Sequence, residues 1–134
     1  MIITEISQVD RLAERMLSND SDIVSLDVKD YDLIKQNSTS LQAVTVEIPS
    51  LDKAGIAIFA NAIKDFEVVG AGQALLQFCG KSNNIEENIS LNEMNSILGV
   101  FEAHFGKVNM IWGLTERKNA ETAGYLINVI VGYK

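Results

Sequence analysis

Short runs rich in β-branched and aromatic residues alternate with longer stretches of helical periodicity along this chain. The runs predicted as strands are 43–48, 73–79, 110–114 and 126–131. The stretches predicted as helices are 6–17, 31–36, 51–66 and 91–105. Because side chains repeat every two residues in a strand and every 3.6 in a helix, the two patterns are not interchangeable. The order predicts an α+β fold with a four-stranded mixed sheet, two helices on one face, and a preceding N-terminal helix and acidic loop.

The strongest local signal is Ser90-Leu91-Asn92-Glu93. A serine three residues before a glutamate forms a capping box, in which each side chain accepts a hydrogen bond from the other residue's backbone N–H at a helix start. An apolar stripe follows at steps of three and four residues: Leu91, Met94, Leu98, Phe101 and Phe105. This stripe predicts a helix packed on a sheet, and Gly106 is well placed to end it.

Other element boundaries rest on single residues. Pro49 closes the strand predicted at 43–48, and Ser50 is a plausible N-cap for the helix that follows. Ser18-Asn19-Asp20 is expected to end the first helix. Polar segments at 80–89 and 115–122 are expected to be loops.

Length and charge limit the function classes. The 134 residues suit one compact unit, and the formal net charge is −7. Residues 1–50 carry nine acids against four bases, so the acidic excess lies mainly in the N-terminal part. The lysines and arginines are scattered, whereas a nucleic-acid interface needs them clustered on one face. We therefore expect no nucleic-acid partner.

The chain is also expected to be cytoplasmic. It shows no apolar stretch of membrane-spanning length and no leader pattern at its start, so no membrane partner is expected. The single cysteine, Cys79, allows no disulfide within the chain and fits a reducing compartment. Cys79 and the single histidine, His104, lack companion residues at nucleophile or ligand spacing, so we expect no metal site.

The segment Ser25-Leu26-Asp27-Val28-Lys29-Asp30 carries the clearest chemistry. Two carboxylates three residues apart at the entry to a helix can point outward together, where they could polarise a water molecule or hold a cation. The same pattern is also the ordinary way to cap a helix and to compensate its dipole. The residues alone leave both interpretations open.

Several stretches together resemble the tubulin and FtsZ superfamily, specifically the C-terminal half of the bacterial cell-division protein FtsZ. Residues 23–31, IVSLDVKDY, are similar to the family's L-I-N-x-D-F-x-D-V "synergy" loop, with both acids in register. Residues 72–80, GQALLQFCG, resemble its G-A-x-x-x-L-x-N-I strand, and the 90–93 capping box resembles its L-x-x-E helix start. Residues 110–113, MIWG, resemble its I-I-F/W-G strand end, and 127–133, INVIVGY, its closing V-T-V-I-A-T-G-F strand.

The resemblance implies a particular organisation. Residues 1–36 would form the end of the family's central helix, the synergy-like loop and a short helix, and residues 37–134 its C-terminal α/β sandwich. The Gly-rich phosphate loop of the family's GTP-binding domain has no counterpart here, and Gly70-Ala71-Gly72 leads into a strand rather than a helix. We therefore expect no cofactor bound by the chain itself, and GTP contact only through a partner subunit.

The resemblance also assigns roles to the acidic segment. In the family, this loop reaches the GTP of the neighbouring subunit in a filament, and its acids help to position the attacking water. That role falls in trans on Asp27 and Asp30. Ser25 departs from the family's Asn, which is longer and has an amide donor, so the correspondence is incomplete at that position.

Three functions follow as hypotheses. The first is a non-nucleotide-binding protein-interaction module in cell division or a bacterial cytoskeletal assembly, with an FtsZ-like protein or a second copy as its partner. The second supplies Asp27 and Asp30 to a partner's GTPase site, so that the chain contributes to hydrolysis without being an enzyme alone. The third is a stand-alone small-ligand-binding or homo-oligomeric regulatory domain, because one fold hosts many functions.

Overall fold

The computed structural model describes residues 2–17, 22–80, 90–115 and 124–134. The helices are α1 (Ile6–Leu17), α2 (Val28–Gln36), α3 (Lys53–Ile63) and α4 (Leu91–Phe105). The strands are β1 (Asp22–Val24), β2 (Ser40–Ile48), β3 (Ala71–Cys79), β4 (Asn109–Thr115) and β5 (Tyr125–Tyr133). Both predicted loops lie largely outside the described residues, as does the expected end of the first helix at 18–20.

The sheet has the strand order β1-β4-β3-β5-β2. Four long strands form the predicted mixed sheet: β3 and β4 run parallel, and β5 lies antiparallel between β3 and β2. The helix α4 makes the crossover that a parallel pair requires. The sequence analysis missed β1, a three-residue strand that pairs antiparallel with the end of β4. It precedes the acidic segment and lies where only a loop was expected.

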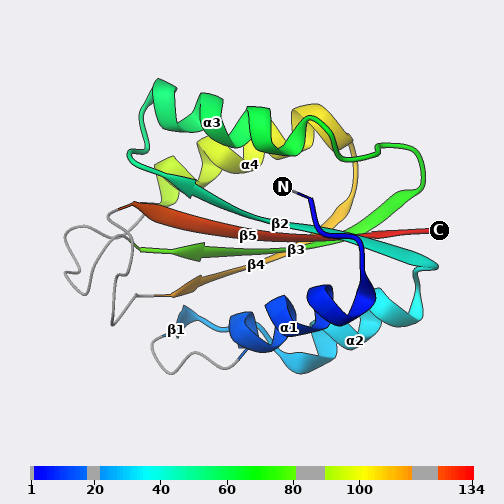
Figure 1. The fold of residues 1–134 in the computed structure, drawn as a ribbon. Coiled ribbons are helices and arrows are strands. Elements are labelled where there is room, and N and C mark those ends of the chain that lie inside the picture. The colour runs from blue at the N-terminus through cyan, green and yellow to red at the C-terminus, as the bar shows by residue number, and fades with distance from the viewer. Residues whose placement is uncertain (1, 18–21, 81–89, 116–123) are drawn as a thin grey trace.

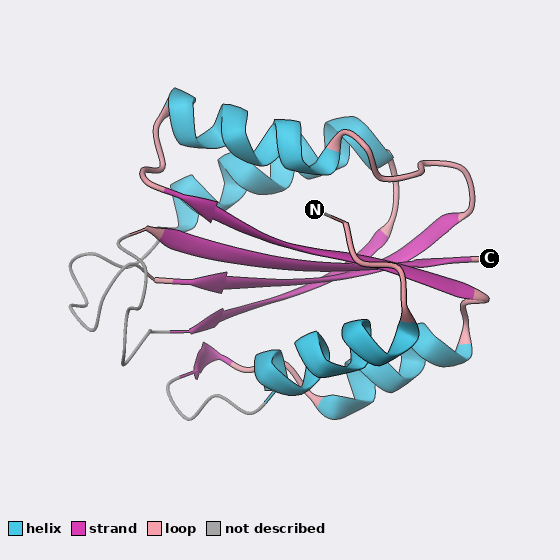
Figure 2. Ribbon diagram, viewed as in Figure 1, coloured by secondary structure: helices cyan, strands magenta, loops and turns pink. Residues whose placement is uncertain are grey.

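Helices cover both faces of the sheet, as Figures 1 and 2 show. The predicted pair, α3 and α4, lies on one face, and α1 and α2 lie on the other. The larger core lies under α3 and α4 and includes Phe59, Phe78 and Phe101, all essentially inaccessible to solvent. The smaller core lies under α1 and α2 and includes Leu12, Met16 and Leu75. The smaller core therefore fixes α1, which precedes the acidic segment, and α2, whose first turn belongs to it.

Two helix starts differ from the predictions. The helix α2 begins at Val28 rather than Tyr31, because Asp27 caps it and places Asp30 in its first turn. The helix α3 is capped by Asp52 rather than Ser50, and it ends at Ile63 rather than near Phe66. The Asp52 carboxylate accepts hydrogen bonds from the N–H groups of Ala54 and Gly55, both at 3.1 Å. Ser50 instead donates its hydroxyl to Asp52 at 2.7 Å.

The predicted start and end of α4 are both present. Ser90 Oγ accepts from the Glu93 N–H at 3.2 Å, and Glu93 Oε1 accepts from the Ser90 N–H at 3.1 Å. Gly106 ends the helix with a φ of 73°, a backbone conformation that glycine adopts without strain. Within the described ranges, no helix is both long and apolar enough to cross a bilayer.

Candidate functional site

The acidic segment joins β1 to α2 and includes the first turn of that helix. Val24 ends β1, Ser25 is exposed, and Leu26 turns inward to join the smaller core. Close approach to β4 is possible because residue 113 is glycine: a Cβ there would lie 2.7 Å from Leu26 Cγ and 2.9 Å from the Val24 carbonyl oxygen. Such distances are shorter than van der Waals contact. Because glycine has no side chain at position 113, the acidic segment can pack against the sheet.

Asp27 and Asp30 form a capping box, the structural alternative considered from the sequence. Asp27 Oδ1 accepts from the Lys29 N–H, and Asp30 Oδ2 accepts from the Asp27 N–H, both at 2.9 Å. Each carboxylate thus satisfies a backbone donor at the start of α2. These bonds fix both side chains at the surface, with Asp27 exposed and Asp30 half-buried. The bonds identify a structural role for both acids, which leaves their catalytic role a prediction.

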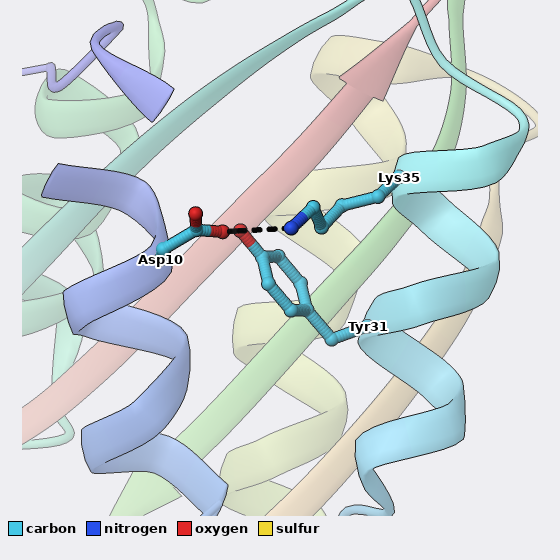
Figure 3. A network of polar contacts seen from close by, with 3 residues as sticks. All are labelled: Asp10, Tyr31 and Lys35. Carbon is cyan, nitrogen blue, oxygen red and sulfur yellow. Dashed lines mark hydrogen bonds and ion pairs between the residues drawn. The ribbon is translucent and has the colours of Figure 1, made fainter. Parts of the chain in front are cut away.

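A polar network joins α1 to α2 beside the acidic segment (Figure 3). Asp10 of α1 points toward α2, where its Oδ1 accepts from the Tyr31 hydroxyl at 2.6 Å and from Lys35 Nζ at 3.1 Å. The hydrogen bond from Tyr31, aided by Lys35, lowers the pKa of Asp10 below its usual 3.8. Burial and the neighbouring Asp10 raise the pKa of Tyr31 above its usual 10.0. The neutral phenol and the carboxylate therefore stabilise each other and hold α2 in place.

A second network, which the sequence analysis did not identify, crosses three strands beneath α1. Thr45 of β2 donates to Asn128 of β5 at 2.7 Å, and Asn128 donates to Gln77 Oε1 of β3 at 3.1 Å. Gln77 Nε2 then donates to the Met16 carbonyl at 2.7 Å. That carbonyl is one of the C-terminal groups of α1 that lack a partner within the helix. The network thus anchors the helix end that leads to the acidic segment.

The acidic segment lies at one end of the strands. The register places Thr115 opposite both Asp22 and Cys79, and Ile48 opposite Tyr125. Figure 1 shows that α2, α3 and α4 also begin at this end. We call this surface the acidic end, defined by these described side chains: Asp27, Asp30, Glu47, Asp52 and Glu93. Lys29 and Lys53, in the first turns of α2 and α3, lie at the same end.

The chemistry available at the acidic end follows from these side chains. Carboxylates can accept hydrogen bonds from water or from donors on a protein surface. Among the described residues, no group of three histidine, cysteine or acidic side chains could hold a metal ion. His104 instead makes a 3.1 Å hydrogen-bond contact with the Phe66 carbonyl, and Cys79 is buried. The acidic end is therefore best described as a surface on which the described carboxylates outnumber the ammonium groups.

Comparison with known proteins gives matches at the level of structure. No protein-family model matches the sequence, and no curated protein matches it. Among solved structures, an empty FtsZ dimer from M. jannaschii aligns over 96% of this chain with a TM-score of 0.62 and 15% identity. A GTPγS-form protofilament of TubZ from Bacillus thuringiensis serovar israelensis aligns over 94%, with a TM-score of 0.64 and 19% identity.

The chain has the fold of the FtsZ and tubulin C-terminal domain. The predicted family resemblance is thus confirmed at the level of fold. The chain spans 40% of the length of the FtsZ structure and 34% of that TubZ structure. A four-stranded TubZ-Bt filament model gives a similar match, with a TM-score of 0.66 and 33% of its length covered. This chain therefore matches only one part of each FtsZ or TubZ chain. Both of these TubZ structures are filament structures.

Proposed function

We propose that this chain is a protein-interaction module that docks, through its acidic end, on a filament-forming protein of the FtsZ or TubZ fold. The observation that supports this proposal is the rigid presentation of the acidic segment in an FtsZ-type domain. Capping bonds, the Gly113 contact and the Asp10 network all fix its position. A preorganised surface loses little conformational entropy when it binds.

The module brings no nucleotide site of its own. Its sequence has no Gly-rich phosphate loop, so any contact with GTP would be made on the partner's nucleotide. The expected partner surface is one that offers hydrogen-bond donors or positive charge to Asp27 and Asp30. Such a partner would assemble with the chain, or the chain would block assembly by occupying a subunit's place.

A second candidate function is a contribution to GTP hydrolysis in trans. It is favoured by the position of Asp27 and Asp30, two carboxylates fixed side by side at the start of α2. Held near a partner's γ-phosphate, they would orient the attacking water. Positioning and general-base groups of this kind contribute roughly 100-fold or more to rate. Ser25, exposed beside them, would have to replace the amide that FtsZ-type loops carry at this position.

The test uses a purified filament-forming GTPase of the FtsZ or TubZ fold, with the intact chain added in increasing amounts. Sedimentable polymer and phosphate release are measured together. Docking predicts that the chain changes polymer yield, and Asp27→Asn with Asp30→Asn should weaken that effect. Catalysis in trans predicts, in addition, faster turnover that the double variant abolishes. Asp65→Asn is the matched control, because it removes an exposed carboxylate that lies outside the acidic end.

Absence of any effect on polymer or turnover would contradict both candidates. Calorimetry of the chain alone with GTP provides an independent check, and no heat of binding is expected. Micromolar GTP binding by the isolated chain would contradict the proposed division of roles.

A further inference from the structure

In the part of the chain that the structure describes, the outer edge of β4 is unpaired over most of its length. The strand β1 pairs only with Leu114 and Thr115, and Figure 2 shows it beside the arrowhead end of β4 alone. Within the described residues, nothing pairs with the outer edge from Asn109 to Gly113. An unpaired strand edge presents backbone N–H and C=O groups that can bind another strand.

The direction of the backbone groups can be assigned residue by residue. The Gly80 N–H donates to the Thr115 carbonyl at 2.9 Å, so Thr115 directs its backbone toward β3. Backbone groups alternate between the two edges along a strand, and the β3–β4 register has no shift. Leu114, Trp112 and Met110 therefore point their backbone groups to the outer edge. Leu114 faces Val24 of β1, whereas the outward backbone groups of Met110 and Trp112 have no strand partner among the described residues.

The edge also lacks the usual devices against strand pairing. The β4 sequence, NMIWGLT, contains no charged residue and no proline, although lysine and proline are the common protections of edge strands. The opposite edge of the sheet differs. There, Ile3 exchanges two backbone hydrogen bonds with Ala43 of β2, and Glu47 adds a charge further along. The β4 edge is thus the more accessible of the two.

An apolar cavity lies directly beside this edge, between β4 and α2. Its volume is about 120 Å³, and its lining includes Leu33, Ile34, Ala74 and Ile111, with Asp30 at the α2 side. Leu33 is 48% exposed and Ile111 is 38% exposed. Apolar cavities of about 150 Å³ hold a group as large as benzene. This one is suited to a single aliphatic side chain.

One polar group in the cavity wall also lacks a partner. Gln73 lines the cavity, and its Oε1 is the only buried side-chain oxygen or nitrogen in the described residues without a hydrogen bond. A buried acceptor without a donor is costly, so such groups are normally paired.

We propose that the β4 edge binds an extended peptide segment of a partner protein by β-strand addition, at a site that adjoins the acidic end at Asp30. The bound peptide lies antiparallel to β4, as β1 does, and occupies the part of the edge beyond Val24. Its backbone pairs with Met110 and Trp112. One of its aliphatic side chains enters the cavity beside Ile111. Basic residues flank that side chain, because Asp30 lines the cavity and the chain carries a net charge of −7.

The probe is a displayed library of random twelve-residue peptides, selected against the full chain, with the enriched peptides then synthesised. The expected sequences alternate apolar and polar residues and contain lysine or arginine beside the central apolar one. In amide hydrogen exchange, Met110 and Trp112 exchange quickly in the free chain and become protected when a peptide binds. Protection confined to other residues, enrichment of helical amphipathic sequences, or no binder at all would overturn the proposal.

Variants locate the binding site. Ile111→Lys places a charge in the cavity and should weaken the selected peptide roughly tenfold or more. Val69→Lys is the control, because Val69 is 91% exposed in the turn before β3 and should leave affinity unchanged. Folding of both variants is checked by their amide spectra. Should Ile111→Lys unfold the chain, methylation of the peptide's edge-facing amide nitrogens provides the same test, and unchanged affinity of the methylated peptide would disprove strand addition.

Discussion

Asp10 Oδ1 accepts hydrogen bonds from both the Tyr31 hydroxyl and Lys35 Nζ, so one carboxylate oxygen of α1 fixes two turns of α2. The two donors are unequal. The bond from Tyr31 is shorter, at 2.6 Å against 3.1 Å, and is the main cause of the lowered Asp10 pKa. Lys35 and Asp10 are both well exposed, so their ion pair is largely screened by solvent. Tyr31 should therefore contribute more to stability.

Replacement of Tyr31 by phenylalanine should lower the free energy of unfolding by about 1 to 2 kcal/mol, because it removes a hydrogen bond to a charged acceptor. Lys35→Gln should cost roughly 0.2 to 1 kcal/mol. Urea denaturation at neutral pH measures both. Equal effects of the two variants would contradict the proposed ranking.

The same pair predicts a pH dependence. The Asp10 pKa is lower in the folded chain, so its stabilisation is present above the usual value of 3.8 and is lost as pH falls through the folded pKa. The Tyr31 pKa is raised, so its stabilisation is complete below the usual value of 10.0 and is lost as pH rises through the folded pKa. Thermal melts from pH 2 to 11 should show a smaller stability difference between wild type and Tyr31→Phe at the acidic extreme than at neutral pH. A constant difference would rule out this linkage.

Gln77 should be among the most sensitive polar residues. Gln77→Leu removes the donor to the Met16 carbonyl and the acceptor for Asn128, and Gln77 is only 3% exposed. Buried groups left without partners cost about 1 to 3 kcal/mol each. Thr45→Val, at the exposed end of the same network, should cost less because water can replace the hydroxyl. Urea denaturation midpoints of the two variants measure this difference. Equal midpoints for Gln77→Leu and Thr45→Val would contradict the expectation.

Gly113 should be intolerant of a side chain. Gly113→Ala places a Cβ against Leu26 and the Val24 carbonyl, so it should displace the acidic segment and destabilise the chain by about 1 to 3 kcal/mol. Gly99→Ala is the matched control, because Gly99 lies within α4 and has open space around it. That change should stabilise the helix by roughly 0.5 to 1 kcal/mol. Amide shifts of residues 24–30 should move in the first variant alone.

The sequence predicted local structure better than it predicted contacts between distant residues. The β-branched runs and the Ser90 capping box identified the four long strands and α4, because those signals depend on neighbouring residues. The strand β1 was missed because three residues carry too little periodicity, and its pairing depends on space that Gly113 provides 89 residues later. The polar network of Thr45, Asn128 and Gln77 was equally hidden, since only the strand register brings those residues together.

The acidic segment illustrates the same limit. From the sequence, capping and catalysis were both compatible with Asp27 and Asp30, and the structure shows the capping bonds directly. Capping does not exclude a catalytic role, because a capping carboxylate remains at the surface. Variants that separate charge from capping are therefore the informative ones.

Asp27→Asn and Asp27→Ala make that separation. Asparagine caps a helix about as well as aspartate, so Asp27→Asn should change the free energy of unfolding by only a few tenths of a kcal/mol. Alanine cannot accept the Lys29 N–H, so Asp27→Ala should cost about 0.5 to 2 kcal/mol. If the carboxylate acts on a partner, both variants should lose the same partner effect on polymer or turnover despite their different stabilities. If Asp27 is only a cap, Asp27→Asn should retain the full partner effect, and the measured loss should follow stability alone.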